Sequence, residues 1–474
     1  RWKMDFVTPE SALDGAVDDY EEIQARAYLR YKERMRGFNA VDFDDLIHLP
    51  VKLLEADDDL RARWQKRYDY LLIDEYQDTN SAQYRFARAL VDDRENLCVV
   101  GDDDQSIYGF RGAEVEKILS FKKDFPLAHV ITLESNYRSV TSILEPANAV
   151  IAKNPRRHPK KLISMRGEGE PIQFSIYDGE QEEASSVVAK VQRARKMGVP
   201  LLKQAILLRS AIQARPFEEK LRFFEIPYTI IGGRSYFDRR EIRDALSFLR
   251  ALVFPEDDIA LLRILNVPKR GFGKAAREVI DECSRNRGIS VQAVLEDPGL
   301  MSAVSPAGQK GGQKLMEALH AARAELNHDG SEALKQLLEE VVYDDHLKEI
   351  SGGDPQDLEA RRTAVDSLFE SVARFESKKG QGKLDQWLRD ISLDSDNNED
   401  HGGDILTLMT FHGAKGLEFP VVHLVGVEEG LIPHRRAINE DPEKGEEEER
   451  RLMYVAMTRA MDQLHMSMAR TRRR

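Results

Sequence analysis

The feature that most constrains the fold is a set of short apolar runs, each followed at once by polar or glycine-containing sequence. These runs cover residues 70–73, 97–100 and 129–133, and sequence with helical spacing of apolar residues separates them. Short apolar runs that alternate with helices are typical of buried parallel strands in an α/β sheet. Because ligands bind at the carboxyl ends of such strands, the polar residues just after each run are the first candidates for a functional site.

The pattern changes several times along the 474 residues. Residues 11–37 predict one long charged helix, and residues 235–400 are mostly helical. Strand-like runs flank that helical stretch at 172–177, 205–208, 228–231, 405–410, 421–427 and 464–468. A domain of about 150 residues is common, so the length suggests roughly three compact units. We therefore predict an α/β protein that is interrupted by a helical insertion, with the acidic segment 394–403 as a linker.

Composition excludes some classes of protein and leaves others open. No apolar run reaches the roughly 20 residues of a membrane helix, and the N-terminus has no secretory signal pattern. Cys98 and Cys283 lack the spacing of metal ligands, which suits a reducing cytoplasm. The net charge of -13 argues only weakly against nucleic-acid binding, because a motor needs a basic groove rather than a basic surface.

The strongest local signal is Asp74-Glu75 at the end of the first apolar run. Asp74 would hold Mg²⁺ through water, since that ion prefers oxygen ligands and keeps part of its hydration shell. Glu75 would then orient and deprotonate an attacking water. The plainer alternative is a strand that ends in two solvated acids.

The second signal follows the strand-like run 97–100, where a polar loop carries a carboxamide and then aromatic and cationic groups. Gln105 would sense a γ-phosphate or its water. Phe110 would stack on a nucleic-acid base, a contact worth about 1–3 kcal/mol for any base. One loop would thereby touch nucleotide and DNA; the alternative is an Asp-rich turn followed by a core aromatic residue.

Five segments resemble the motifs of superfamily 1A DNA helicases of the UvrD/Rep/PcrA family, in the family's order and with the closest likeness to Rep. Residues 74–80 resemble motif II, and residues 101–108 resemble motif III. Residues 133–139, 410–419 and 449–460 resemble motifs IV, V and VI. The resemblance covers nearly the whole chain, with residues 42–46 and 266–273 also similar to the group.

The resemblance implies roles for individual residues. Tyr137 would stack on adenine, and Glu418 would bind the ribose. Arg138 and Arg459 would reach the γ-phosphate as arginine fingers, although either alone would more simply be a surface salt bridge. The other implied contacts are with DNA. The residues on the single-strand track would be Tyr108, Phe110, Arg111, Thr410 and His412. A loop with Lys269, Arg270, Gly271 and Gly273 would contact duplex DNA; the alternative is an ordinary basic turn.

The resemblance also implies an architecture of two RecA-like domains of the P-loop NTPase type, with parallel sheets and inserted helical subdomains. Residues 1–55 would be the remainder of helical subdomain 1B, and 56–136 part of domain 1A. Domain 2A would comprise 137–233 and 403–474, and residues 234–402 would form subdomain 2B. ATP would bind between the two RecA-like domains.

The sequence departs from the family pattern in specific places. No Gly-x-x-x-x-Gly-Lys-Ser/Thr phosphate loop occurs in it, and the chain stops soon after motif VI. We therefore expect truncation at both ends, and weak ATP binding by the chain as given. Phe110 stands where the group commonly has tryptophan. The smaller phenylalanine ring would keep the stacking contact with a base but would weaken it.

The leading hypothesis is an ATP-dependent 3′–5′ helicase and translocase on single-stranded DNA, with ATP and Mg²⁺ as cofactors. The expected partners are single-stranded DNA, single-strand/duplex junctions, replication or repair proteins and a second copy of the chain on DNA. The expected location is the bacterial cytoplasm, at the nucleoid and without a membrane. Two other interpretations stay open: a subunit of a RecB/AddA-like helicase-nuclease, and a non-hydrolysing DNA-binding protein that lacks the phosphate loop.

Overall fold

The computed structural model describes residues 2–37, 40–231, 236–326, 328–379, 383–392 and 403–472. The chain forms two compact units. Unit 1 comprises Arg1–Ile176 and Phe411–Ala469, and unit 2 comprises Tyr177–Thr410 and Arg470–Arg474. The predicted linker at 394–403 and the predicted boundaries near 233 and 402 lie almost wholly outside the described residues. The four-part division into subdomains therefore stays a prediction.

Unit 1 begins with four helices, and the first two of them stand where the sequence predicted one long helix over residues 11–37. They are α1 (Pro9–Asp14), α2 (Asp19–Gly37), α3 (Asp45–Ala56) and α4 (Asp58–Gln65). The prediction of a single helix was wrong because Gly15 ends α1. Asp18 then starts α2, and its side chain accepts a hydrogen bond from the backbone N–H of Glu21 at 2.8 Å, as an N-cap does.

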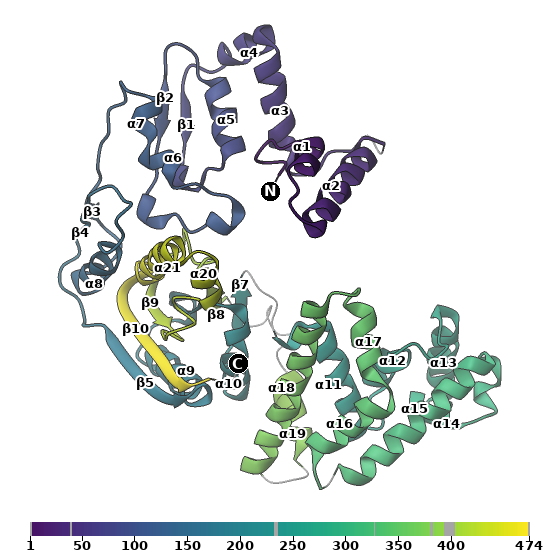
Figure 1. Ribbon diagram of the computed structural model, residues 1–474. Helices are drawn as coiled ribbons and strands as arrows, with labels where there is room; N and C mark the ends of the chain where they lie inside the picture. The colour runs from purple at the N-terminus through teal and green to yellow at the C-terminus, as the bar shows by residue number, and fades with distance from the viewer. Residues whose placement is uncertain are drawn as a thin grey trace. The chain divides into compact units, whose positions relative to one another are not determined.

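Two predicted strands are confirmed, and they form a parallel pair (Figure 1). β1 (Leu71–Ile73) and β2 (Leu97–Val99) are aligned with Leu71 opposite Leu97. The elements around and after them are η1 (Tyr76–Asp78), α5 (Ser81–Leu90), η2 (Asp103–Gln105), η3 (Gly109–Arg111), α6 (Glu116–Leu119) and α7 (Phe121–Asp124). A capping box of Asn80 and Gln83 starts α5, and Figure 1 shows this helix beside the two strands.

The third predicted strand, at residues 129–133, was wrong. No strand occupies those residues, and Ile131 and Leu133 are 72% and 77% exposed. The short strand β3 (Ser135–Asn136) follows instead and pairs in parallel with β4 (Ile163–Ser164). An apolar run becomes a ladder only where another strand offers its backbone groups, and among the described residues none does so for 129–133.

The remainder of unit 1 surrounds a third parallel pair. β9 (Phe419–Leu424) and β10 (Ala460–Thr471) run in parallel, with Leu464 opposite Val422. The helices of this part are α8 (Thr141–Ile151), α20 (Arg435–Glu440) and α21 (Pro442–Met457), and the strand β5 (Gln173–Gly179) leads into unit 2. Helix α21 packs on α8 and on α20. This packing brings the segment before β10 next to residues far earlier in the chain.

Unit 2 contains a three-stranded parallel ladder in which β8 lies between β6 and β7. The strands are β6 (Gln204–Leu208), β7 (Tyr228–Ile231) and β8 (Leu406–Thr410), and the associated helical elements are α9 (Glu180–Lys196), η4 (Leu201–Lys203), η5 (Ala211–Gln213) and α10 (Ala214–Phe223). The predicted strands at 205–208, 228–231 and 405–410 are confirmed. All five residues of β6 are buried, as expected for a strand covered on both faces.

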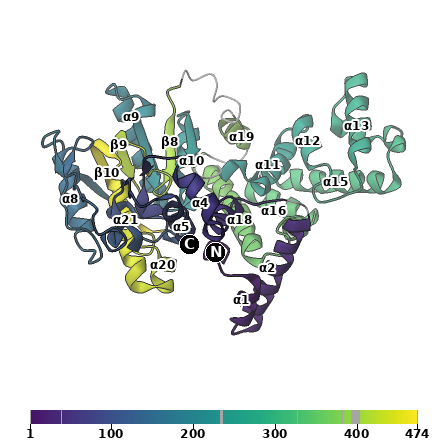
Figure 2. The same cartoon turned by 90° about the horizontal axis from the view of Figure 1, so that it is seen from above.

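The predicted helical stretch is confirmed over its described residues, between residues 236 and 392, where no strand occurs. Its elements are η6 (Tyr236–Asp238), α11 (Arg240–Val253), α12 (Asp258–Ile264), α13 (Lys274–Arg287), α14 (Val291–Glu296), η7 (Leu300–Ala303), α15 (Pro306–Glu325), α16 (Gly330–Glu340), α17 (Tyr343–Ile350), α18 (Pro355–Lys379) and α19 (Leu384–Ser392). Figure 2 shows α11, α12 and α15 side by side. They share one apolar core, in which Phe248, Leu319 and Leu368 are fully buried.

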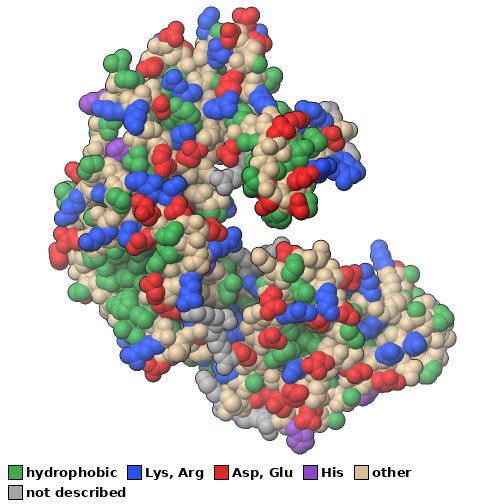
Figure 3. Space-filling model, viewed as in Figure 1, with side chains coloured by type: hydrophobic (Ala, Val, Ile, Leu, Met, Phe, Trp, Pro, Cys, Tyr) green, Lys and Arg blue, Asp and Glu red, His purple; other side chains and the backbone are tan. Residues whose placement is uncertain are grey.

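The surface mixes charges of both signs. Figure 3 shows Lys and Arg side chains interspersed with Asp and Glu on the face that it presents. The net charge of -13 therefore does not gather into one acidic field on that face. Among the described residues, no helix combines the length and the apolar character that crossing a bilayer requires.

Candidate functional site

Strand β1 ends in the acidic pair that the sequence singled out. Glu75 has φ 51° and ψ 41°, a left-handed backbone that is unusual for a residue with a side chain. Its N–H donates to Asp74 Oδ1 at 2.8 Å, and Gln77 Nε2 donates to Glu75 Oε2 at 2.5 Å. Backbone strain of this kind costs about 1–3 kcal/mol and clusters at functional sites. The strained turn presents both carboxylates at the carboxyl end of β1.

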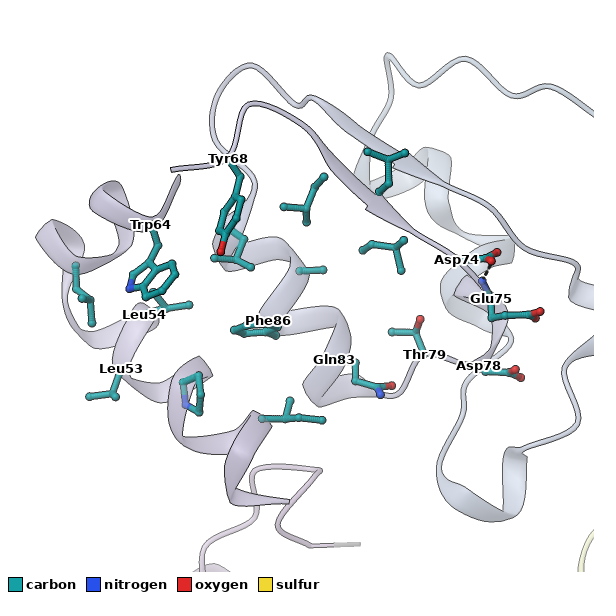
Figure 4. Close-up of a pocket in the computed structure, with 18 residues that line it drawn as sticks. Leu53, Leu54, Trp64, Tyr68, Asp74, Glu75, Asp78, Thr79, Gln83 and Phe86 are labelled. Carbon is teal, nitrogen blue, oxygen red and sulfur yellow. Dashed lines mark hydrogen bonds between the residues drawn. The ribbon is translucent and has the colours of Figure 1, made fainter. Parts of the chain in front are cut away.

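A cavity of about 990 Å³ in unit 1 opens beside this strand tip (Figure 4). One end is apolar, with Trp64, Tyr68 and Phe86 in its wall. The other end carries three carboxylates, from Asp74, Glu75 and Asp78. The cavity therefore combines an apolar wall with hard oxygen ligands at one rim.

The carboxylates suit a divalent cation that keeps its own waters. Asp78 Oδ1 is buried and has no hydrogen-bond partner among the described residues, while Asp74 is exposed at the rim. The described residues contain no group of three side chains that could cage a metal ion. Mg²⁺ needs no such cage, because one or two carboxylates and phosphate oxygens hold it together with water.

Lys415 completes the acidic end, and the sequence reasoning missed it. Its ammonium group donates hydrogen bonds to the Asp78 carboxylate and, at 2.8 Å, to the backbone carbonyl of Gln105. It also lies 3.5 Å from Glu75 Oε2, and its side chain is only 6% exposed. Burial raises the pKa of Asp78, and the hydrogen bond and charge of Lys415 oppose that rise. A lysine between Ala414 and Gly416 carried no signal that would have predicted a buried ion pair.

Replacing Lys415 with methionine should destabilise the protein by about 3 kcal/mol, because removing one partner of a buried ion pair leaves the other charge uncompensated. Urea unfolding of the variant measures this loss. The double variant Lys415→Met/Asp78→Asn should recover part of the lost stability, because neither site then carries an unpaired buried charge. Equal stability of Lys415→Met and the wild-type protein would contradict the ion pair as a stabilising contact.

Arg459 lies at the centre of the site. Its guanidinium donates to the carbonyls of Val455, at 2.9 Å, and Leu417, at 3.2 Å. A third contact runs from Nη2 to Gln105 Oε1 at 3.4 Å. Burial is the main cause that lowers the pKa of Arg459, to about 10, and nearby Arg138 lowers it further. The group therefore stays positive at neutral pH and is held beside the Gln105 carboxamide.

The other candidate nucleotide contacts lie close by in unit 1. Arg138 Nε donates to Glu418 Oε2 at 2.6 Å, so these two predicted site residues form an ion pair. The ring of Tyr137 is 73% exposed, which leaves a free face for stacking. Arg138 and Glu418 both interact electrostatically with Arg459. The structure thus brings residues of the predicted motifs II to VI together.

The aromatic residues after Gln105 form a cluster with His412. The Phe110 ring is 65% exposed and meets the His412 ring edge to face, with 5.3 Å between ring centroids. Tyr108 donates its hydroxyl to the His412 carbonyl at 3.4 Å, and Arg111 lies 5.4 Å from the centre of the Phe110 ring. Thr410, also predicted to contact DNA, is the last residue of β8 and belongs to unit 2. We call Tyr108, Phe110, Arg111 and His412 the aromatic cluster.

A second residue that the sequence reasoning missed, Gln77, joins the two strand tips. Its Nε2 binds Glu75, and its Oε1 accepts from the backbone N–H of Asp102 at 3.0 Å. Gly101 makes room for this bridge, because a Cβ there would stand 2.5 Å from Gln77 Oε1. Gln77 is fully buried. A polar residue one turn after a strand gave no hint of this role before the fold was known.

The predicted basic loop lies in unit 2, between α12 and α13. Lys269 is exposed and pairs with Glu349. The Arg270 guanidinium donates to the carbonyls of Ile264 and Val267, and burial lowers its pKa to about 10. The four-residue prediction of a DNA contact stays a prediction, and Arg270 is used inside the loop.

The glycines of this loop differ in what they require. Gly271 has φ +86°, and a Cβ there would stand 2.8 Å from backbone atoms of Ala307 and Gly308. Gly273 is the N-cap of α13, with open space around it. The first glycine is thus fixed by packing, and the second leaves the N–H groups of a helix N-terminus accessible, as at anion sites.

Comparison with known proteins accounts for both halves of the chain. Residues 1–126 match the model of the UvrD/REP helicase N-terminal domain. Residues 131–471 match the model of the UvrD-like helicase C-terminal domain. Together these matches cover nearly all of the chain, and they support the RecA-like α/β architecture expected from the motifs.

Individual relatives are similar along the same length. The ATP-dependent DNA helicase PcrA of Staphylococcus epidermidis is 38% identical over 475 residues, covering 99% of this chain and 64% of PcrA. The ATP-dependent DNA helicase Rep of Salmonella typhimurium is 39% identical over 484 residues, covering 100% of this chain and 70% of Rep. PcrA of Staphylococcus aureus is 36% identical over 473 residues. The chain thus spans about 64% of the length of the PcrA relatives, and on the family matches it belongs to the UvrD-like DNA helicases.

Proposed function

We propose that this chain is the motor body of an ATP-dependent DNA helicase that translocates on single-stranded DNA. One observation carries the proposal: a continuous set of contacts joins the acidic strand tip to a buried arginine. Lys415 Nζ lies 3.5 Å from Glu75 and 2.8 Å from the Gln105 carbonyl, and the Gln105 side chain meets Arg459. Carboxylates opposite cations are what hydrolysis of a nucleoside triphosphate requires. The relatives named PcrA and Rep are ATP-dependent DNA helicases.

In the proposed reaction Glu75 takes a proton from a water molecule as that water attacks the γ-phosphorus of ATP. The bond from the γ-phosphorus to the bridging oxygen breaks, and ADP leaves with that oxygen. Arg138 and Arg459 would neutralise charge on the γ-phosphate oxygens, and Gln105 would orient the water or the phosphate. Glu418 and Tyr137 would bind the ribose and the adenine. Arg138 would leave Glu418 for phosphate, because both ligands compete for one guanidinium.

Mg²⁺ is part of the proposal. Asp74 would hold it through water, and Asp78 Oδ1, which is buried without a hydrogen-bond partner among the described residues, offers a second oxygen at the same rim. When bound, the ion would neutralise charge on the phosphate oxygens. Both carboxylates would serve to orient its waters.

We propose that the aromatic cluster carries the single-stranded DNA. The exposed Phe110 ring would stack on a base, and Arg111 would attract the phosphates. Replacing Phe110 with alanine should weaken single-strand affinity by about 1–3 kcal/mol, and Phe110→Trp should preserve or raise that affinity. Fluorescence anisotropy with labelled oligonucleotides in buffer of fixed salt measures both variants. Unchanged binding by Phe110→Ala would assign the ring to packing against His412.

The direction of movement is proposed as 3′ to 5′, as is typical of the family. The decisive experiment measures DNA-stimulated ATPase and strand separation by the full-length protein on duplexes with 3′ or 5′ overhangs. Unwinding from 3′ overhangs alone is the expected result. Absence of DNA-stimulated hydrolysis would contradict the motor, and unwinding from 5′ overhangs alone would reverse the proposed polarity.

Other parts of the proposal rest on the same DNA substrate. The helices between residues 236 and 392 would form the 2B subdomain, and Lys269, Arg270, Gly271 and Gly273 would contact duplex near a junction. Replication or repair proteins and a second copy of the chain on DNA are the proposed partners. The proposed location is the cytoplasm, at the nucleoid, where the DNA substrate would lie.

A further inference from the structure

A buried cluster of charges lies behind the Gln105 loop, and the proposed reaction does not use it. Asp102, Asp103 and Asp104 precede Gln105, and they face Arg157 and Lys160 from the segment after α8. We call these five residues the ion cluster. The side chains of Asp103 and Asp104 are 4% and 2% exposed, and those of Arg157 and Lys160 are 14% and 11% exposed. So many nearly buried charges are costly unless each is paired.

The pairing within the ion cluster is specific. Arg157 grips Asp104 with two hydrogen bonds, at 2.8 and 2.6 Å, and Lys160 lies 2.6 Å from Asp103 and 3.0 Å from Asp104. Burial lowers the pKa of Lys160, but the carboxylates of Asp102, Asp104 and Asp103 together outweigh it, so that the net shift is upward. Lys160 therefore stays positive near neutral pH, and the buried carboxylates of Asp103 and Asp104 each have a basic partner.

The Asp102 side chain connects the ion cluster to the reaction site. Its Oδ1 lies 3.0 Å from Lys160 Nζ and accepts from the Asp104 N–H at 3.1 Å. Its Oδ2 accepts from Gln105 Nε2 at 2.7 Å. Since the Gln105 nitrogen faces this carboxylate, the Gln105 oxygen is left to face Arg459, at 3.4 Å. A carboxamide turned the other way would set its NH₂ group against a guanidinium, and both are donors.

We propose that Asp102 is a positioning residue that fixes the orientation of the Gln105 carboxamide, with Lys160 holding Asp102 in place. The chain of contacts runs from Lys160 through Asp102 and Gln105 to Arg459. This inference rests on the proposed function, in which Gln105 and Arg459 act on the γ-phosphate. It adds a residue that touches neither nucleotide nor DNA and works only through Gln105.

Asp102→Asn tests the proposal, because asparagine has the same shape but only one acceptor oxygen. That oxygen can accept from Gln105 Nε2, or it can face Lys160 Nζ and the Asp104 N–H, but it cannot do both. The asparagine NH₂ group then faces the remaining donor. We expect kcat of the DNA-stimulated ATPase to fall about 10²-fold, as for a misplaced catalytic group, with little change in KM for ATP. Asp102→Asn combined with Gln105→Ala should be no slower than Gln105→Ala, since Asp102 acts through that side chain.

Asp103→Asn is the matched control, because Asp103 binds Lys160 in the same cluster without touching Gln105. It should lower the melting temperature and leave kcat near the wild-type value. Lys160→Met, which keeps the hydrogen bond from Gln105 to Asp102, should give a kcat between those of the wild type and Asp102→Asn. Three outcomes would each overturn the proposal. They are a wild-type kcat in Asp102→Asn, a fall in kcat in Asp103→Asn as large as that in Asp102→Asn, and a double variant Asp102→Asn/Gln105→Ala that is slower than Gln105→Ala. A wild-type protein without DNA-stimulated ATPase would instead refute the proposed function.

Discussion

Glu75→Gln should lower the DNA-stimulated ATPase rate of the full-length protein by about 10²–10⁴-fold, the contribution of a general base. Glutamine has the size of glutamate and can still accept the hydrogen bond from Gln77, so the left-handed turn at residue 75 keeps its partner. It cannot take a proton from water at neutral pH. ATP affinity should stay near the wild-type value, because the base acts on water rather than on the nucleotide.

A coupled-enzyme assay gives the rate, and equilibrium binding of a fluorescent ATP analogue gives the affinity. Asp59→Asn removes an exposed carboxylate from α4, away from the carboxylate rim, and serves as the matched control. It should hydrolyse ATP like the wild type. Normal turnover by Glu75→Gln would show that another group is the base.

Arg459→Lys should lower kcat by about 10³-fold, the low end for loss of an arginine finger. Lysine keeps the positive charge, but it is a point charge without the planar fork that reaches several acceptors at once. The wild-type guanidinium spans the Val455 and Leu417 carbonyls and Gln105. Single-turnover hydrolysis separates this effect from product release, and single-strand DNA affinity should change little.

Thermal unfolding must accompany that measurement, because Arg459 is almost fully buried. Arg436→Lys is a suitable control, since Arg436 is exposed on α20 and pairs with Glu440 one turn away. A variant Arg459→Lys that folds and hydrolyses ATP at the wild-type rate would remove the finger assignment. If DNA affinity fell by the same factor as the hydrolysis rate, Arg459 would be assigned to DNA binding instead.

The sequence predicted which segments are helices and strands better than it predicted which strands pair with each other. The runs at 71–73 and 97–99 became parallel strands because each has a neighbour to pair with. The run at 129–133 has the same apolar character and remained irregular. Apolar character predicts what a segment would bury, and only the fold decides whether another segment is there to bury it.

The candidate site shows the same division between what is local and what is distant. Asp74, Glu75 and Gln105 were predicted because each follows a strand-like run, and Arg459 because it lies in a segment that resembles a family motif. Lys415 was not predicted, because its partner Asp78 lies hundreds of positions away in the sequence. Asp102 was not predicted, because its contact with Gln105 depends on the orientation of one carboxamide. Such contacts depend on which surfaces meet in three dimensions, which motif spacing does not encode.

The short path between Gln105 and Phe110 has a thermodynamic consequence. Both side chains stand on one segment, since η2 ends at Gln105 and η3 begins at Gly109. If nucleotide shifts this segment and thereby changes its grip on a base, the base must change nucleotide affinity by the same factor. A long oligonucleotide should therefore alter the equilibrium constant for a non-hydrolysable ATP analogue, and the analogue should alter oligonucleotide binding to an equal extent.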